Sequence, residues 1–318
     1  MAPVLTPLTG YDGLTALGIV APPVIGLLFC FWDWRAISRV RLDGQKGDGV
    51  LDRALLEQRE GQLDAMKHIG GLIAEGADSF LTAAHRYMVV FTLVFAWLVG
   101  LVADGLAAAA FVTGCCTSIL AGHVGMKIAT YTNSRTTHAC WRSLAAGFLV
   151  AVRGGCIASF FLISVGLLSL FALIVVFGAI GGWREDELWA SLAGFSFGVS
   201  SIALFDRVGG GIYTKAADIG ADLSGKLDFG LMEDDYRNPA CIADQVGDNV
   251  GGVVGKGADL LGSLTGAICA ALCISGSSRE LRCGDSPGHI VEGIASNWTA
   301  MMFPLLLSTS SILVACLS

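Results

Sequence analysis

Long stretches without Asp, Glu, Lys or Arg dominate this sequence. A helix that crosses a lipid bilayer needs about 20 mostly apolar residues. The charge-free runs are Leu14–Trp32, Tyr87–Ala103, Gly105–Met126, Gly154–Trp183, Leu188–Phe205, Leu260–Ser278 and Gly293–Ser318. We therefore predict about seven spans in an all-α, polytopic transmembrane helix bundle, with residues 1–318 as a single transmembrane domain. This makes the chain an integral, multi-pass membrane protein in contact with the lipid bilayer.

The composition excludes other classes of protein. Of the 318 residues, 54% are hydrophobic and only 15% are charged, whereas an ordinary soluble domain has about 25% charged residues. The net charge of −7, without a basic cluster, argues against a nucleic-acid partner. The ten cysteines lie mostly inside apolar runs and form no CxxC pair, which is not the pattern of a disulfide scaffold.

The basic residues are distributed unevenly between the connections. Of the 20 Lys and Arg residues, 17 lie in the odd-numbered connections between the seven runs. Because cytosolic loops of membrane proteins carry an excess of Lys and Arg, we expect the odd-numbered connections to face the cytosol. The first of them, residues 35–86, is predicted to be a cytosolic connection in the form of a solvated helical loop.

One segment, residues 206–259, has an unusual concentration of acidic residues. It contains ten of the 27 carboxylates of the chain, although it flanks and enters two predicted spans. Ionisable groups near a membrane interior are costly and point to function. The ten are Asp206, Asp218, Asp222, Asp228, Glu233, Asp234, Asp235, Asp244, Asp248 and Asp259.

The spacing of these residues places them on helix faces. Side chains three, four and seven positions apart share one face of an α-helix. One such set is Lys215, Asp218, Asp222 and Lys226, and a second is Asp244, Asp248, Gly255 and Asp259. A loop at residues 233–239 joins the two helices. We therefore expect two facing rows of carboxylates with a lysine beside them.

Such an arrangement suits magnesium and phosphate. Mg²⁺ prefers oxygen ligands, usually one or two carboxylates together with phosphate oxygens and water. Lys215 would add a positive point charge for a phosphate group. The alternative is a network of helix caps and ion pairs around a polar loop. We favour that alternative for Asp234 and Asp235, and the magnesium site for the two pairs of aspartates.

Two long motifs point to a family. The runs RVGGGIYTKAADIGADLSGK, from Arg207 to Lys226, and EDDYRNPACIADQVGDNVG, from Glu233 to Gly251, resemble the membrane-bound, ion-translocating inorganic pyrophosphatases. The segments AEGADSFL (residues 74–81) and GMKIATYTNSRTT (residues 125–137) agree with this resemblance. It extends over nearly the whole chain.

The resemblance implies a homodimer that hydrolyses Mg-pyrophosphate on the cytosolic side and pumps H⁺, or less readily Na⁺, to the other side. Mg²⁺ is the implied cofactor, and K⁺ is a further cation that the family allows. The implied substrate and metal ligands are Lys215, Asp218, Asp222, Glu233, Asp244 and Asp248, and the implied ion gate is Arg207 and Asp259. The membrane could be that of a vacuole, an acidic calcium-storing organelle, or a bacterial cell.

Three positions depart from the family pattern. Gly252 stands where the family has an aspartate that helps to orient the attacking water, a role that contributes about 10²–10⁴-fold to rate. Gly266 stands where the family has a glutamate. Lys256 replaces an apolar residue one turn before Asp259, and we expect it to pair with Asp259. The alternative for Lys256 is that it faces a water-filled cavity.

The length is the largest departure, because the family's subunit is roughly twice as long. We expect the chain to be the N-terminal part of a larger pyrophosphatase bundle, as a fragment or a truncated gene product, that hydrolyses pyrophosphate very slowly or not at all by itself. Two functions remain: a pyrophosphate-energised proton pump, and a catalytically inactive relative that acts only as a membrane or oligomerisation partner. An unrelated transporter with an acidic mouth is disfavoured by the long motifs.

Overall fold

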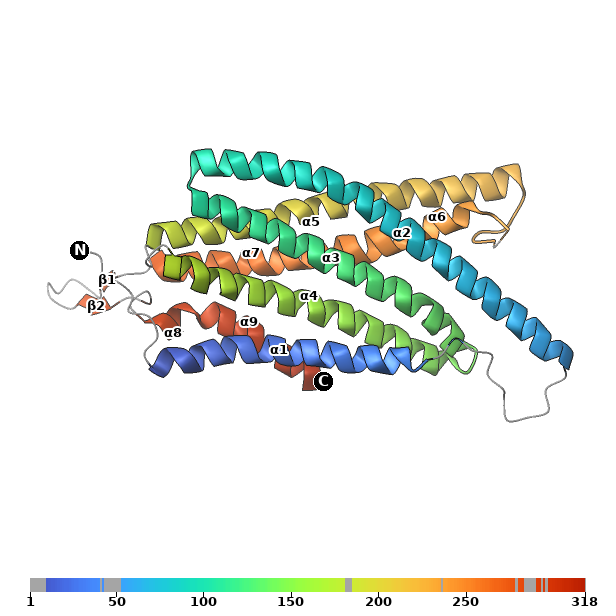
Figure 1. Cartoon of the computed structure of the whole chain (residues 1–318), viewed down its shortest axis with the longest axis horizontal. Coiled ribbons are helices and arrows are strands. Elements are labelled where there is room, and N and C mark those ends of the chain that lie inside the picture. Colours follow the sequence, from blue (N-terminus) through green and yellow to red (C-terminus); the bar gives the residue numbers. More distant parts are fainter. Residues whose placement is uncertain are drawn as a thin grey trace.

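The structure is a computed structural model that describes residues 10–40, 42, 53–180, 185–235, 237–277, 280–282, 290–292, 294 and 297–317. Long helices lie side by side in an elongated bundle (Figure 1). In chain order the elements are α1 (Gly10–Ser38), α2 (Arg53–Val102), α3 (Gly105–Cys140), α4 (Leu144–Ile180), α5 (Glu185–Asp222), η1 (Leu223–Asp228), α6 (Ala240–Gly247), η2 (Asp248–Gly255), α7 (Lys256–Ser277), β1 (Glu280–Arg282), β2 (Ile290–Glu292), α8 (Trp298–Met301) and α9 (Phe303–Leu317).

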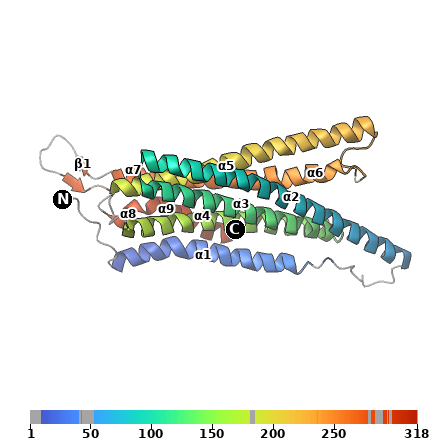
Figure 2. The ribbon, with the colours of Figure 1, turned by 45° about the horizontal axis from the view of Figure 1, so that its top comes forward.

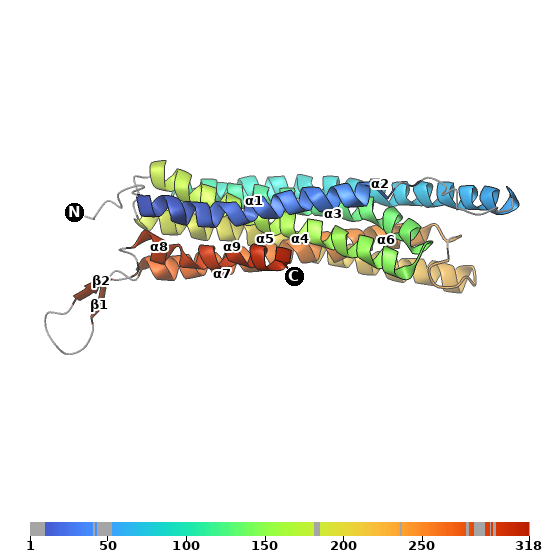
Figure 3. The same cartoon turned by 90° about the horizontal axis from the view of Figure 1, so that it is seen from below.

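The predicted all-α polytopic bundle is confirmed. Within the described residues, six helices are long and apolar enough to cross a membrane. They are α1, α2, α3, α4, the continuous pair of α5 and η1, and the continuous set of α6, η2 and α7. The one addition is a short antiparallel hairpin, in which Glu280 pairs with Glu292. Figure 3 shows this hairpin at the end of the bundle opposite α6.

The seventh predicted run is divided in the described part of the chain and is not among the six candidate spans found there. Residues 297–317 of the run Gly293–Ser318 form two short helices, because Asn297 caps α8 and the chain turns at Met302. The second of them, α9, has 15 residues and reaches Leu317. It packs beside α1 (Figure 3).

The ends of the helices alternate between the two ends of the bundle. The C-terminal ends of α1 and α3, the N-terminal ends of α2 and α4, and the loop between η1 and α6 lie at one end (Figures 1 and 2). The junction between α2 and α3 lies at the other end, where Asp104 caps α3 by accepting a hydrogen bond of 2.6 Å from the backbone N–H of Ala107. Successive helices therefore run in opposite directions, as successive membrane spans do.

Helix α2 is the longest helix, with 50 residues. This helix contains residues 53–86 of the predicted connection and nearly all of the apolar run from Tyr87 to Ala103. Its later part exposes large apolar side chains such as Leu93, Trp97 and Leu101, which suits contact with lipid. Its earlier part extends beyond the neighbouring helices (Figure 1).

Three apolar clusters hold the described part of the bundle together, and two of them bear on the position of the acidic segment. The larger joins α1, α4, α5, α7 and α9 and includes the fully buried side chains of Leu170, Phe195 and Leu261. The smaller packs α2 and α3 against α6 and η2 through Leu81 and Met126 among others. Because α6 and η2 carry part of the acidic segment, this smaller cluster positions those carboxylates.

Candidate functional site

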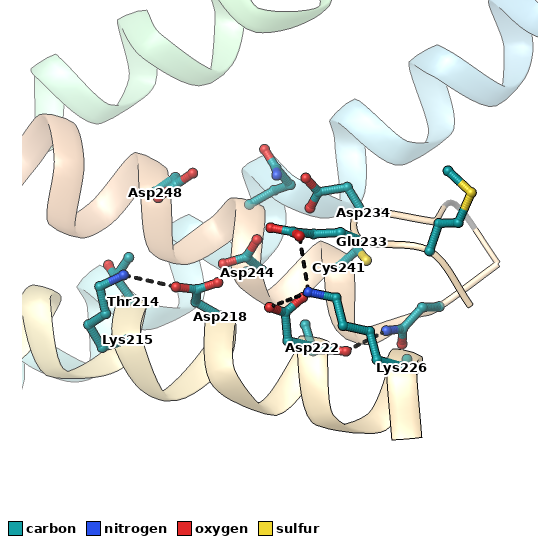
Figure 4. A pocket seen from close by; sticks show the side chains of 15 residues that line it. Thr214, Lys215, Asp218, Asp222, Lys226, Glu233, Asp234, Cys241, Asp244 and Asp248 are labelled. Atoms are coloured by element: carbon teal, nitrogen blue, oxygen red, sulfur yellow. Dashed lines mark hydrogen bonds and ion pairs between the residues drawn. The ribbon is translucent and has the colours of Figure 1, made fainter. Parts of the chain in front are cut away.

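A polar pocket lies at the end of the bundle where α5 and η1 face α6 and η2 (Figure 4). Its volume is about 220 Å³. All six residues that the sequence suggests as substrate or metal ligands line it, and they come from both helices and from the loop between them. These six are Lys215, Asp218, Asp222, Glu233, Asp244 and Asp248. The structure thus brings together the side chains that helical spacing predicts to face one another.

The two helices approach closely beside the pocket. The hydroxyl of Thr214 on α5 donates hydrogen bonds to the carbonyl oxygens of Gly210, at 2.8 Å, and Gly247, at 2.7 Å. A Cβ atom at Gly247 would lie only 2.8 Å from the Cα atom of Thr214. A Cβ atom at Gly251 would collide with the Thr214 hydroxyl. Glycine at these two positions is therefore what allows the carboxylate rows to face each other.

Both helices contain a π-helical stretch at the pocket. Helix α5 continues as η1, and α6 continues as η2 before α7 begins. Such stretches are rare and occur frequently at functional sites. The α-helical spacing that relates Lys226 to Lys215 in the sequence does not apply through η1, yet Lys226 still lines the pocket.

Two lysines make the ion pairs of the pocket. The ammonium group of Lys215 lies 2.9 Å from Asp218 Oδ2. That of Lys226 lies 3.0 Å from Asp222 Oδ2 and 3.0 Å from Glu233 Oε2, so Lys226 ties α5 to the loop (Figure 4). The sequence places Lys226 on the same face but gives no sign of its contact with Glu233, which depends on the fold of the loop.

The pocket carries an excess of negative charge. Six carboxylates line it against two ammonium groups, because Asp234 joins the five predicted acids. Asp218 and Asp222 on α5 face Asp244 and Asp248 on the other helix (Figure 4). Like charges at this proximity repel, and bound cations relieve the repulsion.

The loop between the helices gives the neighbouring residues Asp234 and Asp235 different contacts. Asp235 accepts hydrogen bonds from the side chain of Arg237, at 2.9 and 2.6 Å, and these lower the pKa of Asp235 to about 2. This is the ion-pair role that we favour from the sequence. Asp234, which has a positive φ of 57°, lines the pocket instead. Asn238 anchors the loop by donating a hydrogen bond of 2.9 Å to the carbonyl oxygen of Ala221.

The donor set of the pocket fits magnesium. The described residues contain no group of three or more His, Cys, Asp or Glu side chains that could hold one metal ion among themselves. The carboxylates are instead distributed around the pocket, in pairs one helical turn apart. Mg²⁺ is usually bound in this way, by one or two carboxylates that are supplemented by water and by substrate phosphates.

The two suggested gate residues are not joined to each other. Arg207 on α5 and Asp259 on α7 are both exposed, and no ion pair joins them in the described structure. Their roles therefore stay predictions.

The expected pair between Lys256 and Asp259 is wrong as well, since the ion pairs between described residues do not include it. Lys256 instead lines a second cavity of about 480 Å³, between α3, α4, η2 and α7. This is the alternative that the sequence left open for Lys256.

Gly252 lies in open space. A Cβ atom built at this position meets no atom within 4 Å. Gly252 lines the cavity of Lys256 rather than the acidic pocket, although Asp248, one turn earlier, lines the acidic pocket. A Cβ atom at this position would therefore fit without displacing its neighbours.

The fold and the pocket define a multi-pass membrane protein with an acidic, lysine-containing site at one end of its helix bundle. The family model described as Inorganic H+ pyrophosphatase matches residues 24–318. The chain belongs to this family.

Curated relatives agree with this assignment. A protein of Moorella thermoacetica, named K(+)-insensitive pyrophosphate-energized proton pump 2, is 41% identical over 210 residues, which cover 66% of this chain and 30% of that protein. Pyrophosphate-energized membrane proton pump 3 of Arabidopsis thaliana is 37% identical over 212 residues, or 64% of this chain and 26% of that protein. A Clostridium tetani protein, provisionally named a K(+)-stimulated pyrophosphate-energized sodium pump, is 39% identical over 252 residues, or 79% and 34%. The chain thus spans about a third of the length of these relatives.

Proposed function

We propose that this chain binds Mg-pyrophosphate in the acidic pocket and provides part of a pyrophosphate-energised proton pump. The observation that carries the proposal is the convergence of Lys215, Asp218, Asp222, Glu233, Asp244 and Asp248 on one pocket of about 220 Å³. A pocket of this size suits a small inorganic anion better than a drug-sized ligand, which needs about 300–1,000 Å³.

The charges of the pocket explain why cations would accompany the substrate. Pyrophosphate carries several negative charges, and the pocket is itself acidic. Mg²⁺ would be held by Asp218 and Asp222 on one side of the pocket and by Asp244 and Asp248 on the other. When bound, Mg²⁺ neutralises charge and polarises phosphoryl oxygens. Glu233 would complete the carboxylate set from the loop.

The lysines would act on the substrate directly. Lys215 and Lys226 carry point charges that suit phosphate oxygens, and both already lie at the pocket wall, held by Asp218 and by Asp222 with Glu233. Substrate would compete with these carboxylates for the ammonium groups. Exchange of partners by Lys226 would couple occupation of the pocket to the position of the loop.

The pocket end of the bundle is proposed to face the cytosol. The loop between η1 and α6 lies at the same end as the C-terminal end of α1 and the N-terminal end of α2 (Figure 1). This end belongs to the odd-numbered connections of the sequence, which carry 17 of the 20 Lys and Arg residues of the chain. In this orientation pyrophosphate would be hydrolysed in the cytosol and H⁺ would move to the opposite side, through a gate that includes Arg207 and Asp259. A homodimer is the proposed assembly.

One observation favours a second candidate, a relative that binds membrane partners without catalysis. The chain has Gly252, which lacks a carboxylate, at the position where the family pattern has an aspartate that orients water. The pump would hydrolyse pyrophosphate and the second candidate would not. The acidic pocket is the same in both.

Binding and turnover test these candidates separately. Binding of pyrophosphate to the chain in lipid nanodiscs is measured with and without Mg²⁺, and release of phosphate is followed in parallel. We expect Mg²⁺-dependent binding that Asp218→Asn and Asp244→Asn weaken at least tenfold and that Asp64→Asn, an exposed carboxylate on α2, does not. Equal binding by all variants would refute the pocket. Phosphate release that depends on Mg²⁺ favours the pump, and its absence favours the second candidate; repeating the assay with K⁺ tests dependence on that ion.

A further inference from the structure

Asp206 is the most deeply buried carboxylate in the described part of the chain, with 4% of its surface exposed. It lies within the span formed by α5, one residue before the exposed Arg207. No hydrogen bond or ion pair joins its side chain to another described residue. It is 12 residues before Asp218, or about 18 Å along the helix from the acidic pocket.

Small and apolar groups surround this carboxylate. A Cβ atom at Gly122 of α3 would lie 3.6 Å from Asp206 Oδ2 and 3.0 Å from a methyl group of Val254. On the other side, a Cβ atom at Gly255 would lie 3.1 Å from the backbone oxygen of Asp206. The carboxylate therefore lies where α3 and η2 both approach α5 closely.

The charged and titratable groups of the neighbouring elements have other partners or are exposed. Lys127 of α3 pairs with Asp78, Arg153 of α4 pairs with Asp33, and the rings of His85 and His123 lie 6.0 Å apart. On η2 and α7 the groups are Asp248, which lines the acidic pocket, and the exposed Lys256 and Asp259. The acidic and basic groups of α6 and η1 lie at the pocket end of the bundle.

An ionised carboxylate without a partner is very costly in such surroundings. Burial in a medium of low dielectric disfavours the charged form by many kcal/mol, so that the group takes up a proton and becomes neutral. In membrane proteins, single acidic groups of this kind form proton relays. The sequence singles out Asp206 only as one of ten acids, because nothing in the spacing shows that α3 covers it.

We propose that Asp206 is a proton-binding site inside the helix bundle, and that it takes up and releases a transported proton. A cavity of about 480 Å³ comes near the carboxylate, because Gly122, whose Cβ would lie 3.6 Å from Asp206 Oδ2, lines it together with Val254 and Lys256. Asp206 itself does not line this cavity. In the uptake step, a hydrated proton in the cavity breaks its bond to water and forms an O–H bond to Asp206; release is the reverse. The direction of net transfer rests on the proposed function, but the binding of the proton does not.

Infrared spectroscopy of the chain in lipid nanodiscs tests this site, because a protonated carboxylic acid has a carbonyl band distinct from that of a carboxylate. We expect such a band at neutral pH, a shift of the band in D₂O without unfolding, and its reversible loss as the pH is raised. Asp206→Asn, which keeps the size of the side chain, should remove one carboxylic acid from the spectrum.

The matched control is Asp33→Asn. Asp33 is also buried, with 8% exposed, but its Oδ1 lies 3.7 Å from Arg153 Nε, so it should be ionised and should not contribute to the band. A band that survives Asp206→Asn, or one that neither exchanges with D₂O nor titrates in the wild type, would overturn the proposal. The wild-type titration decides the matter if the variant does not fold. Failure of pyrophosphate binding with an intact Asp206 band would refute the proposed function alone.

Discussion

The hydroxyl of Thr214 lies 2.7 Å from the carbonyl oxygen of Gly247 and donates a hydrogen bond to it across the contact between α5 and α6. This bond joins the two helices that carry the facing carboxylates, one residue before Lys215 and one residue before Asp248. It therefore fixes the width of the acidic pocket at its inner end.

Replacement of Thr214 by valine should loosen this contact. The variant keeps the size of the side chain but removes a partly buried hydrogen bond, which costs about 0.5–1.5 kcal/mol. We expect a lower thermal unfolding temperature and weaker pyrophosphate binding. Thr113→Val is the control, since Thr113 bonds only within its own helix, to the carbonyl oxygen of Ala109 at 2.8 Å. Equal losses in the two variants would show that the bond between the helices has no special importance.

The close approach at Gly247 gives a second prediction. A methyl group at this position would meet the backbone of Thr214 at 2.8 Å, so Gly247→Ala should force the helices apart at a cost of about 1–3 kcal/mol. Gly252→Ala is the counterpart, because open space surrounds that position, and it should stabilise the helix by about 0.5–1 kcal/mol. Thermal unfolding in detergent measures the stability of both variants. If both variants were stabilised, or both destabilised, the close approach at Gly247 would not be what distinguishes the two positions.

Removal of the Lys226 charge should weaken substrate binding. Lys226→Met abolishes the ion pairs with Asp222 and Glu233, both at 3.0 Å, and leaves the pocket more negative. The variant loses a positive charge that suits phosphate oxygens, so we expect pyrophosphate to bind about tenfold more weakly or worse at a fixed Mg²⁺ concentration. Lys67→Met, on the exposed surface of α2, should bind as the wild type does, and an unchanged affinity of Lys226→Met would remove Lys226 from the site.

Gly252→Asp tests the catalytic role of the departure from the family pattern. The side chain has room, so the fold should be kept, and a carboxylate that positions water should raise the rate of phosphate release by about 10²-fold or more. Gly252→Asn is the control of equal size without the charge. If neither variant releases phosphate faster than the wild type, the missing carboxylate is not what limits turnover.

The pocket could be predicted from the sequence because it depends on local spacing. Asp218 with Asp222, and Asp244 with Asp248, are each one helical turn apart, and the two helices are joined by a short loop. Contacts that depend on the loop could not be predicted. The bridge from Lys226 to Glu233 is made by a loop whose backbone is left-handed at Gly230 and Asp234, with φ of 61° and 57°.

Contacts that depend on packing between helices far apart in the sequence could not be predicted either. The spacing of Lys256 and Asp259 allows an ion pair, but a neighbouring cavity lined by α3 and α4 accepts the lysine instead. The run Gly293–Ser318 has the hydropathy of a span, but the cap at Asn297 and the turn at Met302 divide it. The burial of Asp206 arises from α3, which comes about 80 residues earlier in the chain.

The continuity of α2 has a mechanical consequence. Its 50 residues extend over about 75 Å, whereas a bilayer with its headgroups is about 40–45 Å thick. Roughly 30 Å of unbroken helix would then stand clear of the membrane. When the embedded part of α2 tilts, its far N-terminal end is displaced more than the embedded part itself. A spectroscopic label near Glu60 would therefore report small rotations of the bundle as large displacements.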